Sequence, residues 1–294
     1  MSANHRNMSA ARSRALAAAL ALAATFSTVC AHAQTRPAPV VAPVPVPVAT
    51  YADLAKMAEE ATVVALVEVR NQAVVPPQRA PGLAAGQARL YVEARTAALL
   101  AARAPLGESI SYLVDVPLDS KGKPPKLRKQ RFLIFADAVP GRPGTLQLVE
   151  EGAQVPATAE GEQLARTVIA ALAVPDLPPA ITGVRDVMSV AGNLVGESET
   201  QLFLDTVTSE PVSLSVVRRP GMDPQWGVSW SEIVDQAARA PAPQTIEWYR
   251  LACALPAQLP AGAYLQDDRD ARVRAEADYR YILEQLGPCE RLRT

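Results

Sequence analysis

The apolar and polar positions between residues 62 and 149 alternate in short runs that predict β-strands. In the clearest run, residues 89–96, Leu90, Val92 and Ala94 share one face of the strand. The same reasoning predicts strands at 62–70, 110–116, 130–136 and 145–149. Glycine- and proline-rich breaks separate these runs. Five short strands within about a hundred residues indicate a small closed or nearly closed barrel.

Helical spacing of apolar positions predicts helices on either side of these strands. Thr50 and Asp53 form a capping box at the start of the first helix. Further helices are expected at 158–173, 245–255 and 267–286, and further strands at 181–190, 201–206, 212–218 and 225–230. We therefore expect an α+β protein with two domains. A small β-barrel domain at 50–157 resembles OB-type barrels in its strand pattern, and a domain at 158–294 combines a mixed sheet with two terminal helices.

The first 33 residues have the pattern of a secretory signal peptide. A basic start without acidic residues precedes an apolar run at 15–26, which is too short for a comfortable membrane span. Ala31, His32 and Ala33 then match the A-x-A cleavage signal. We expect cleavage after Ala33 and a periplasmic or secreted protein.

Lipidation of Cys30 is the alternative processing route. Val29 and Ser27 argue against it, because lipoprotein signals need a small residue and a leucine at those positions. Residues 34–49 are expected to form a linker, since their alternating prolines and valines favour extended polyproline II structure.

Signal-peptide cleavage would change the chemical inventory of the chain. The 294 residues include two histidines, His5 and His32, and both would be removed. A chain without histidine cannot use Ser-His-Asp catalysis or hold the common histidine-bearing zinc and haem sites. Three arginines would also leave, so that 26 basic residues face 30 acidic ones. We expect no cofactor, no metal, no nucleic-acid partner and no transmembrane helix in the mature chain.

Two cysteines, Cys253 and Cys289, remain after cleavage. An even pair in an oxidising compartment is more often bonded than free, so we predict a Cys253–Cys289 disulfide. The chain has no CxxC motif of the kind used in redox catalysis.

The strongest local charge feature is a basic run between the third and fourth predicted strands. It holds six cations and no anion, namely Lys121, Lys123, Lys126, Arg128, Lys129 and Arg131. One interpretation is a solvated hairpin whose charges keep the strand ends soluble. The other is a docking hairpin for an anionic partner, such as an envelope component or an acidic protein patch.

The chain contains short matches to motifs of nucleophilic catalysis, but none of them meets the requirements of that chemistry. Ser120 and Lys123 match S-x-x-K, but Gly122 and the prolines that follow exclude the helix that this chemistry needs. GESIS at 107–111 and GVSWS at 227–231 lack the closing glycine of a nucleophile elbow. Catalytic residues are therefore not assigned, and binding is favoured over catalysis.

Carboxylates are the acid–base groups that remain. Acidic pairs occur at 59–60 and 150–151, and three aspartates at 267–270 suit a helix N-terminus. Hydrolysis by carboxylates would need two of them across one cleft, which adjacency in sequence does not show. Trp226 and Trp230 share a strand face and are expected to belong to the core.

The mature chain resembles a set of exported bacterial proteins of unknown function. The resemblance is carried by the stretches ARLYVEARTAALL, YLVDVPLDSKGKPPKLRKQ, PPAITGVRDV, WGVSWSEIVDQAA, TIEWYRLAC and YILEQLGPCER. It implies no activity, cofactor or site residue. The leading hypothesis is a non-catalytic binding or envelope-associated module that docks an anionic partner. A carboxylate-dependent hydrolase and a purely structural envelope protein are the alternatives.

Overall fold

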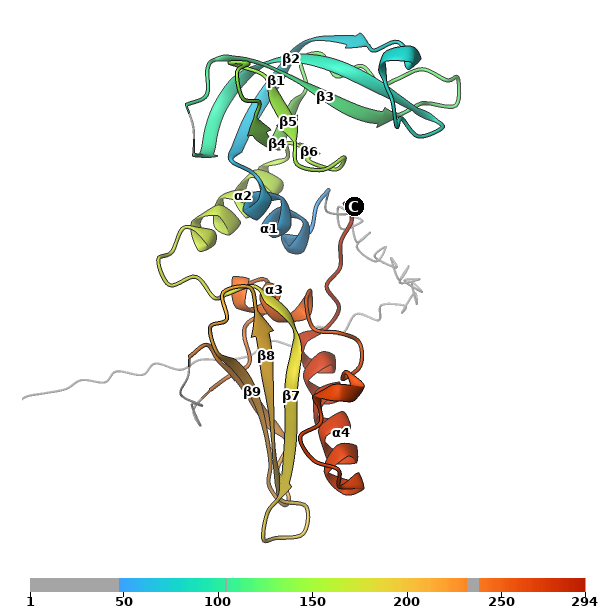
Figure 1. Ribbon diagram of the computed structural model, residues 1–294. Coiled ribbons are helices and arrows are strands. Elements are labelled where there is room, and N and C mark those ends of the chain that lie inside the picture. Colours follow the sequence, from blue (N-terminus) through green and yellow to red (C-terminus); the bar gives the residue numbers. More distant parts are fainter. Residues whose placement is uncertain (1–47, 104, 232–237, 294) are drawn as a thin grey trace, which may run out of the picture. The chain divides into compact units, whose positions relative to one another are not determined.

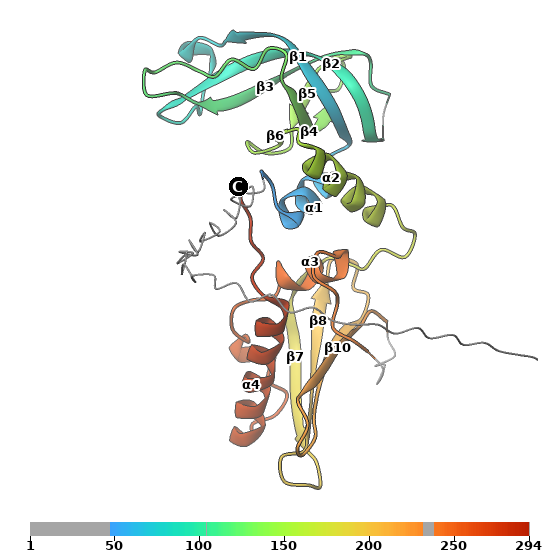
Figure 2. The same ribbon diagram turned by 180° about the vertical axis from the view of Figure 1, so that it is seen from behind.

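A computed structural model describes residues 48–103, 105–231 and 238–293. The predicted signal peptide, and the linker up to residue 47, lie outside the described residues. The described chain is an α+β protein with two sheets and four α-helices, which confirms the predicted class. Figures 1 and 2 show the two sheets from opposite sides.

The first helix, α1 (Tyr51–Glu60), begins where the capping box predicts. The Thr50 side chain accepts the N–H of Asp53, and the Asp53 carboxylate accepts the N–H of Thr50. This reciprocal pair satisfies two N–H groups that a helix start otherwise leaves without partners.

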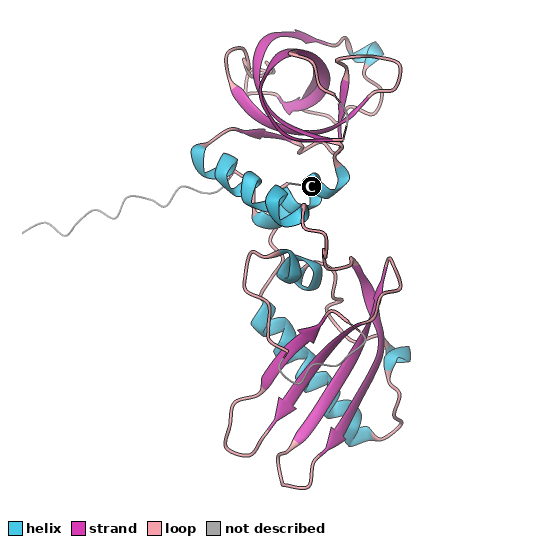
Figure 3. Ribbon diagram, turned by 90° about the vertical axis from the view of Figure 1, so that its left-hand side faces the viewer, coloured by secondary structure: helices cyan, strands magenta, loops and turns pink. Residues whose placement is uncertain are grey.

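The first sheet follows α1 in the chain. Its strands are β1 (Val63–Val74), β2 (Gln87–Ala102), β3 (Ser109–Pro117), β4 (Arg131–Ala138), β5 (Leu146–Leu148) and β6 (Gln154–Pro156), and a short 3-10 turn, η1 (Pro77–Arg79), lies between β1 and β2. The strand order is β3-β2-β1-β4-β5, with β6 also paired to β4. Register shifts interrupt the β1–β2 ladder at three places, and such bulges bend a strand. The sheet curls strongly as a result, as Figure 3 shows.

The two ends of this curled sheet meet without forming a ladder. The described residues of β3 and of the segment before β5 share one isolated parallel bridge, Ser111 with Thr145. The Ser111 N–H donates to the carbonyl of Gly144 at 2.8 Å. Alternate side chains of β2 and β3 point inward, and Leu90, Val92 and Tyr112 are buried there.

The prediction of a basic hairpin was wrong. The chain between β3 and β4, residues 118–130, does not join neighbouring strands, because β2 and β1 lie between them in the sheet. It is a crossover loop, which we call the basic loop together with Arg131 at the start of β4. Charge patterning along the sequence carries no information on which strands become neighbours.

The second sheet contains β7 (Ile181–Ala191), β8 (Ser198–Thr206), β9 (Val212–Arg218) and β10 (Gln225–Ser229), preceded by helix α2 (Ala159–Leu172). The strand order is β10-β9-β8-β7 and every pair is antiparallel. The prediction of a mixed sheet was therefore wrong. Short loops join each strand to the next, and such connections produce antiparallel neighbours.

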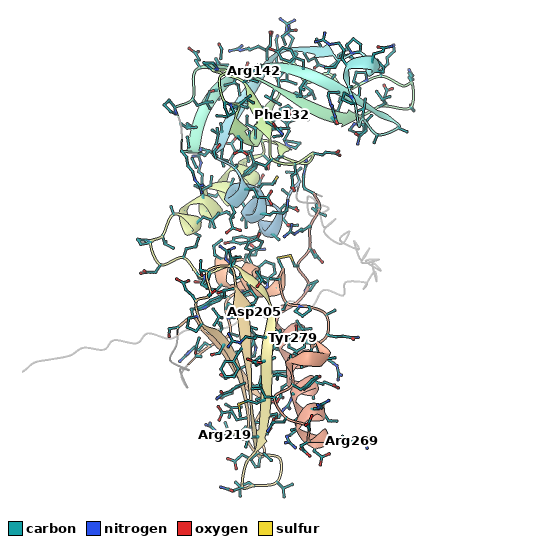
Figure 4. All side chains as sticks on the ribbon, viewed as in Figure 1. Phe132, Arg142, Asp205, Arg219, Arg269 and Tyr279 are labelled. Carbon is teal, nitrogen blue, oxygen red and sulfur yellow. A yellow bond between two sulfur atoms is a disulfide. The ribbon has the colours of Figure 1, made fainter. Side chains whose placement is uncertain are left out.

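Two helices complete the chain, as the sequence predicts. They are α3 (Ile246–Ala252) and α4 (Arg269–Leu286), with a short 3-10 turn, η2 (Ala261–Ala263), between them. Helix α4 covers one face of the second sheet, and Tyr279 lies between the two (Figures 1 and 4). Helix α3 ends at Ala252, three residues before the predicted end at Leu255.

Buried apolar side chains form two clusters. One fills the curl of the first sheet, and the other extends from α1 and α2 through the second sheet to α4. Trp226 and Trp230 were predicted to belong to the core; they are partly buried and pack against the second cluster from its margin. The Trp248 indole is buried and donates to the carbonyl of Leu286 at 2.8 Å.

Candidate functional site

The basic loop is held to the first sheet by backbone and amide contacts. The Gln72 side chain on β1 donates to the Pro125 carbonyl at 2.8 Å and accepts the Leu127 N–H at 2.5 Å. Leu127 is only 5% exposed and joins the core of the first sheet. The Lys129 N–H donates to the carbonyl of Val69 at 2.8 Å. The loop backbone is therefore anchored along β1.

An internal turn orders the first half of the loop. The Asp119 carboxylate accepts the N–H groups of Lys121 and Lys123, each at 2.8 Å. Gly122 has a φ of 71° and belongs to this turn. The structure thus places Ser120 and Lys123 in a turn rather than on a helix, which agrees with the rejection of the S-x-x-K match.

All six basic side chains of the loop are exposed. The Nη2 atom of Arg131 lies 3.7 Å from Oε1 of Glu162 in α2. Within the described residues, the other five, Lys121, Lys123, Lys126, Arg128 and Lys129, form no ion pair. An anchored backbone with unpaired side chains suits electrostatic contact with an external anion.

The basic loop also lies in the more positive part of the chain. Residues 50–157 carry 13 basic and 11 acidic side chains, whereas residues 158–294 carry 12 and 19. An anionic partner would therefore favour the first part over the second.

A cleft of about 1000 Å³ opens on the first sheet, and no pattern in the sequence predicted it. Its lining comes from β1, β2 and β3, from the segment around Arg79, and from the chain between β4 and Glu151. Tyr91 and Leu113 face each other across β2 and β3, and they are 40% and 48% exposed. Large apolar residues on the solvent side of two alternating strands are the signal that could have revealed it.

Charged groups of both signs line this cleft. The Arg89 guanidinium donates two hydrogen bonds of 2.7 Å to the Asp115 carboxylate, and this pairing raises the Arg89 pKa. Glu150 accepts from Lys56, whose pKa is raised mainly by that hydrogen bond. Arg79 and Arg142 also line the cleft, and Figure 4 shows the Arg142 side chain at the surface of the sheet.

Several of the acidic candidates have structural partners. Glu59 pairs with the buried Arg250 of α3, and Asp268 caps α4 by accepting the Ala271 N–H at 2.8 Å. In the cleft, Asp115 and Glu150 are each bound to a cation. Glu151 also lines the cleft and forms no ion pair within the described part of the chain, and the hydrolase alternative stays a prediction.

The predicted disulfide joins the ends of the last two helices. Cys253 caps α3 and Cys289 follows α4, with an S–S distance of 2.03 Å and a Cα–Cα distance of 5.0 Å. Beyond Cys289 the chain binds the start of α1. The Asp53 carboxylate accepts the N–H groups of Leu292 and Arg293 at 3.1 and 3.2 Å. This C-terminal tail is a structural element that the sequence did not reveal.

Comparison with family models and with curated protein sequences yields no relative. No family model matches the chain, and no curated protein sequence matches it significantly. The resemblance to exported bacterial proteins therefore stays a prediction. Among the described residues, no helix is long and apolar enough to cross a membrane. The same residues contain no cluster of three potential metal ligands.

Proposed function

We propose that this protein is an exported binding module of the bacterial cell envelope that docks an anionic partner through its basic loop. The observation that carries the proposal is the state of five cations on that loop. They are exposed and unpaired within the described residues, on a backbone anchored to β1 by Gln72 and Leu127. Their clustering distinguishes them from other surface cations, because residues 121–131 hold six cations and no anion.

We also propose that the first sheet belongs to the OB type. The strand order β3-β2-β1-β4-β5 supports this proposal, as does the parallel contact between its two ends at Ser111 and Thr145. An OB fold is a five-stranded, partly open barrel. The fold alone does not fix a ligand, so the function rests on the loop.

The test reverses the charge of the loop. A variant with Lys121, Lys123, Lys126 and Lys129 all changed to glutamate is compared with the unaltered mature chain. Binding to an anionic-lipid vesicle, a polyglutamate peptide and an acidic oligosaccharide is measured at low and moderate salt. We expect at least a tenfold loss of affinity for the anion that binds best, and a weaker salt dependence in the variant.

The control variant carries the same change in net charge at other exposed positions. These are Arg166, Arg219, Arg269 and Arg280, each changed to glutamate. Equal losses in both variants would indicate a general charge effect and would contradict docking by the loop.

A further inference from the structure

Two turns at one end of the second sheet present exposed apolar side chains. The β7–β8 turn and the β9–β10 turn lie at the same end, because all four strands are antiparallel neighbours (Figure 3). Leu194 and Val195 of the first turn are 62% and 99% exposed, and Met222 of the second turn is 55% exposed. Such side chains project from the protein instead of packing against it, and grouped exposed apolar residues mark interaction surfaces.

The backbone of both turns has partners of its own. The Glu197 carboxylate accepts the N–H groups of Asn193 and Leu194 at 3.0 and 3.2 Å. In the β9–β10 turn, two residues are prolines without an N–H, and the Met222 N–H donates to a carbonyl of the same turn at 3.1 Å. Because a backbone group without a partner is costly to remove from water, these turns can leave water at a lower cost than open loops.

Two arginines flank the projecting side chains. Arg219 belongs to the β9–β10 turn, and Arg269 begins helix α4. The chain before α4 runs parallel to β7, with a bridge between Tyr264 and Val187, so that it reaches the same end of the sheet. Figure 4 shows Arg219 and Arg269 at this end.

Carboxylates accompany these arginines. Asp223 follows Met222 in the turn, and Asp270 follows Arg269. Both carboxylates and both guanidinium groups are exposed, and they form no ion pair or side-chain hydrogen bond within the described residues. The other carboxylates at this end accept hydrogen bonds from the chain itself, namely those of Glu197, Glu199, Asp267 and Asp268. The groups left for an outside partner are therefore two cations and two anions around an apolar centre.

We propose that this end of the second sheet docks on a bilayer of zwitterionic phospholipid, with Leu194, Val195 and Met222 inserted at the level of the headgroups. The guanidinium groups donate to headgroup phosphates, and the two carboxylates accept from headgroup ammonium groups. This inference goes beyond the proposed docking of an anion, because it uses other residues and a lipid without net charge.

A bilayer suits these turns better than a protein partner. A specific interface between folded proteins buries about 800 Å² on each partner, over surfaces of matching shape. Three side chains on two projecting turns offer a much smaller contact. A bilayer accepts apolar side chains without a matching shape, and the free energy gained grows with the apolar area removed from water.

The first test places a tryptophan in the β7–β8 turn. Val195→Trp is mixed with vesicles of phosphatidylethanolamine and phosphatidylcholine whose acyl chains carry bromine, which quenches tryptophan emission. We expect the emission added at this position to fall about twofold relative to vesicles without bromine, because tryptophan rings settle at the membrane interface. The larger ring leaves the fold intact, since Val195 is 99% exposed.

The matched control is Val207→Trp. Val207 is 70% exposed and lies in the β8–β9 turn, at the opposite end of the same sheet. The three native tryptophans supply the same background in both variants. Bromine should leave the emission added at Val207 unchanged.

The second test measures sedimentation of the mature chain with the same vesicles. Changing both Leu194 and Val195 to serine should lower binding about tenfold, because apolar area no longer leaves water. Val207→Ser should bind within about twofold of the unaltered chain, since its side chain faces away from the bilayer. The variant with the four loop lysines changed to glutamate should also bind normally, which separates this contact from the proposed docking loop.

Three results would overturn the bilayer proposal and leave the loop proposal standing. One is the absence of binding by the unaltered chain to zwitterionic vesicles. Another is equal quenching of the tryptophans at positions 195 and 207. The third is vesicle binding that loop reversal abolishes and the double serine variant keeps. A dimer that forms without vesicles and is lost in the double serine variant would make a second copy of the chain the partner of these turns, and would also overturn the proposal.

Discussion

At the scale of single residues, Gly227 of β10 has no room for a side chain. A Cβ atom there would lie 2.2 Å from the carbonyl carbon and oxygen of Ala238. We expect Gly227→Ala to lower the free energy of unfolding by about 1–3 kcal/mol, because the backbone at Ala238 would have to move. Chemical denaturation measures this loss. Gly183→Ala in β7 is the control, since no atom lies within 4 Å of its Cβ position, and an equal loss there would contradict the packing argument.

Asp278 of α4 is fully buried against the second sheet. Its carboxylate accepts from the Thr200 hydroxyl and, at 2.5 Å, from Nε of Arg218. We expect Asp278→Ala to lower the free energy of unfolding by about 1–3 kcal/mol, because it removes a buried hydrogen-bond acceptor, whereas the Arg218 side chain is 34% exposed and can be hydrated. Denaturant titration checks this value, and Asp270→Ala on the exposed first turn of α4 should cost less than about 1 kcal/mol.

At the scale of elements, the disulfide and the C-terminal tail act together. The bond closes a loop with a sequence separation of 36 residues. Replacing both cysteines with serine should lower the free energy of unfolding by about 4 kcal/mol, by the loop-entropy argument. Hydrogen exchange at Leu292 and Arg293, which bind Asp53, should also become faster. Unchanged exchange at these two amides would show that the tail is held without the disulfide.

Local patterns in the sequence predicted most helices and strands. They could not predict features that depend on contacts between residues far apart in the sequence. Alternation revealed β2 and β3, and the Thr50–Asp53 box located α1, because both signals depend on residues close in sequence. Strand β6 was missed, since three residues ending in a proline carry no periodicity. The prediction that β3 and β4 are neighbours was also wrong, because pairing between strands far apart in the sequence depends on the whole sheet.

The candidate site was only half visible in the sequence. The basic loop was conspicuous, because six cations without an anion are visible in any reading of residues 121–131. Its anchoring by Gln72 depends on a contact 55 residues distant and could not be read locally. The cleft combines Tyr91, Leu113 and Arg142 from separate strands and a turn, so it exists only after the sheet has curled.

At the scale of the whole molecule, buried tyrosines lower the free energy of unfolding when the pH becomes alkaline. Burial raises the pKa of Tyr51 to about 12 and of Tyr249 to about 12, with smaller contributions from Glu247 and Glu59. In the unfolded chain these phenols lose their protons near pH 10. The contribution of these two phenols to the free energy of unfolding is complete below pH 10. It is lost as the pH rises from 10 to 12, because the unfolded chain releases their protons more readily than the folded chain does.

The measurement is chemical denaturation across that pH range. The double variant Tyr51→Phe with Tyr249→Phe should lose less stability between pH 10 and pH 12 than the unaltered chain. Equal slopes in the two proteins would show that other groups control alkaline unfolding. Near pH 8 the rings at both positions are neutral in both proteins. The difference in their free energies of unfolding at that pH therefore measures packing without ionisation.

The central claim is that the basic loop is the docking element. Its most direct test is the salt dependence of affinity for the best-binding anion, measured for the mature chain and for the variant with Lys121, Lys123, Lys126 and Lys129 changed to glutamate. We predict that the unaltered chain binds more weakly as salt rises and that the variant has lost most of both its affinity and its salt dependence. Equal affinity and equal salt dependence in the two proteins would contradict the account and leave the loop as a surface feature that keeps the chain soluble.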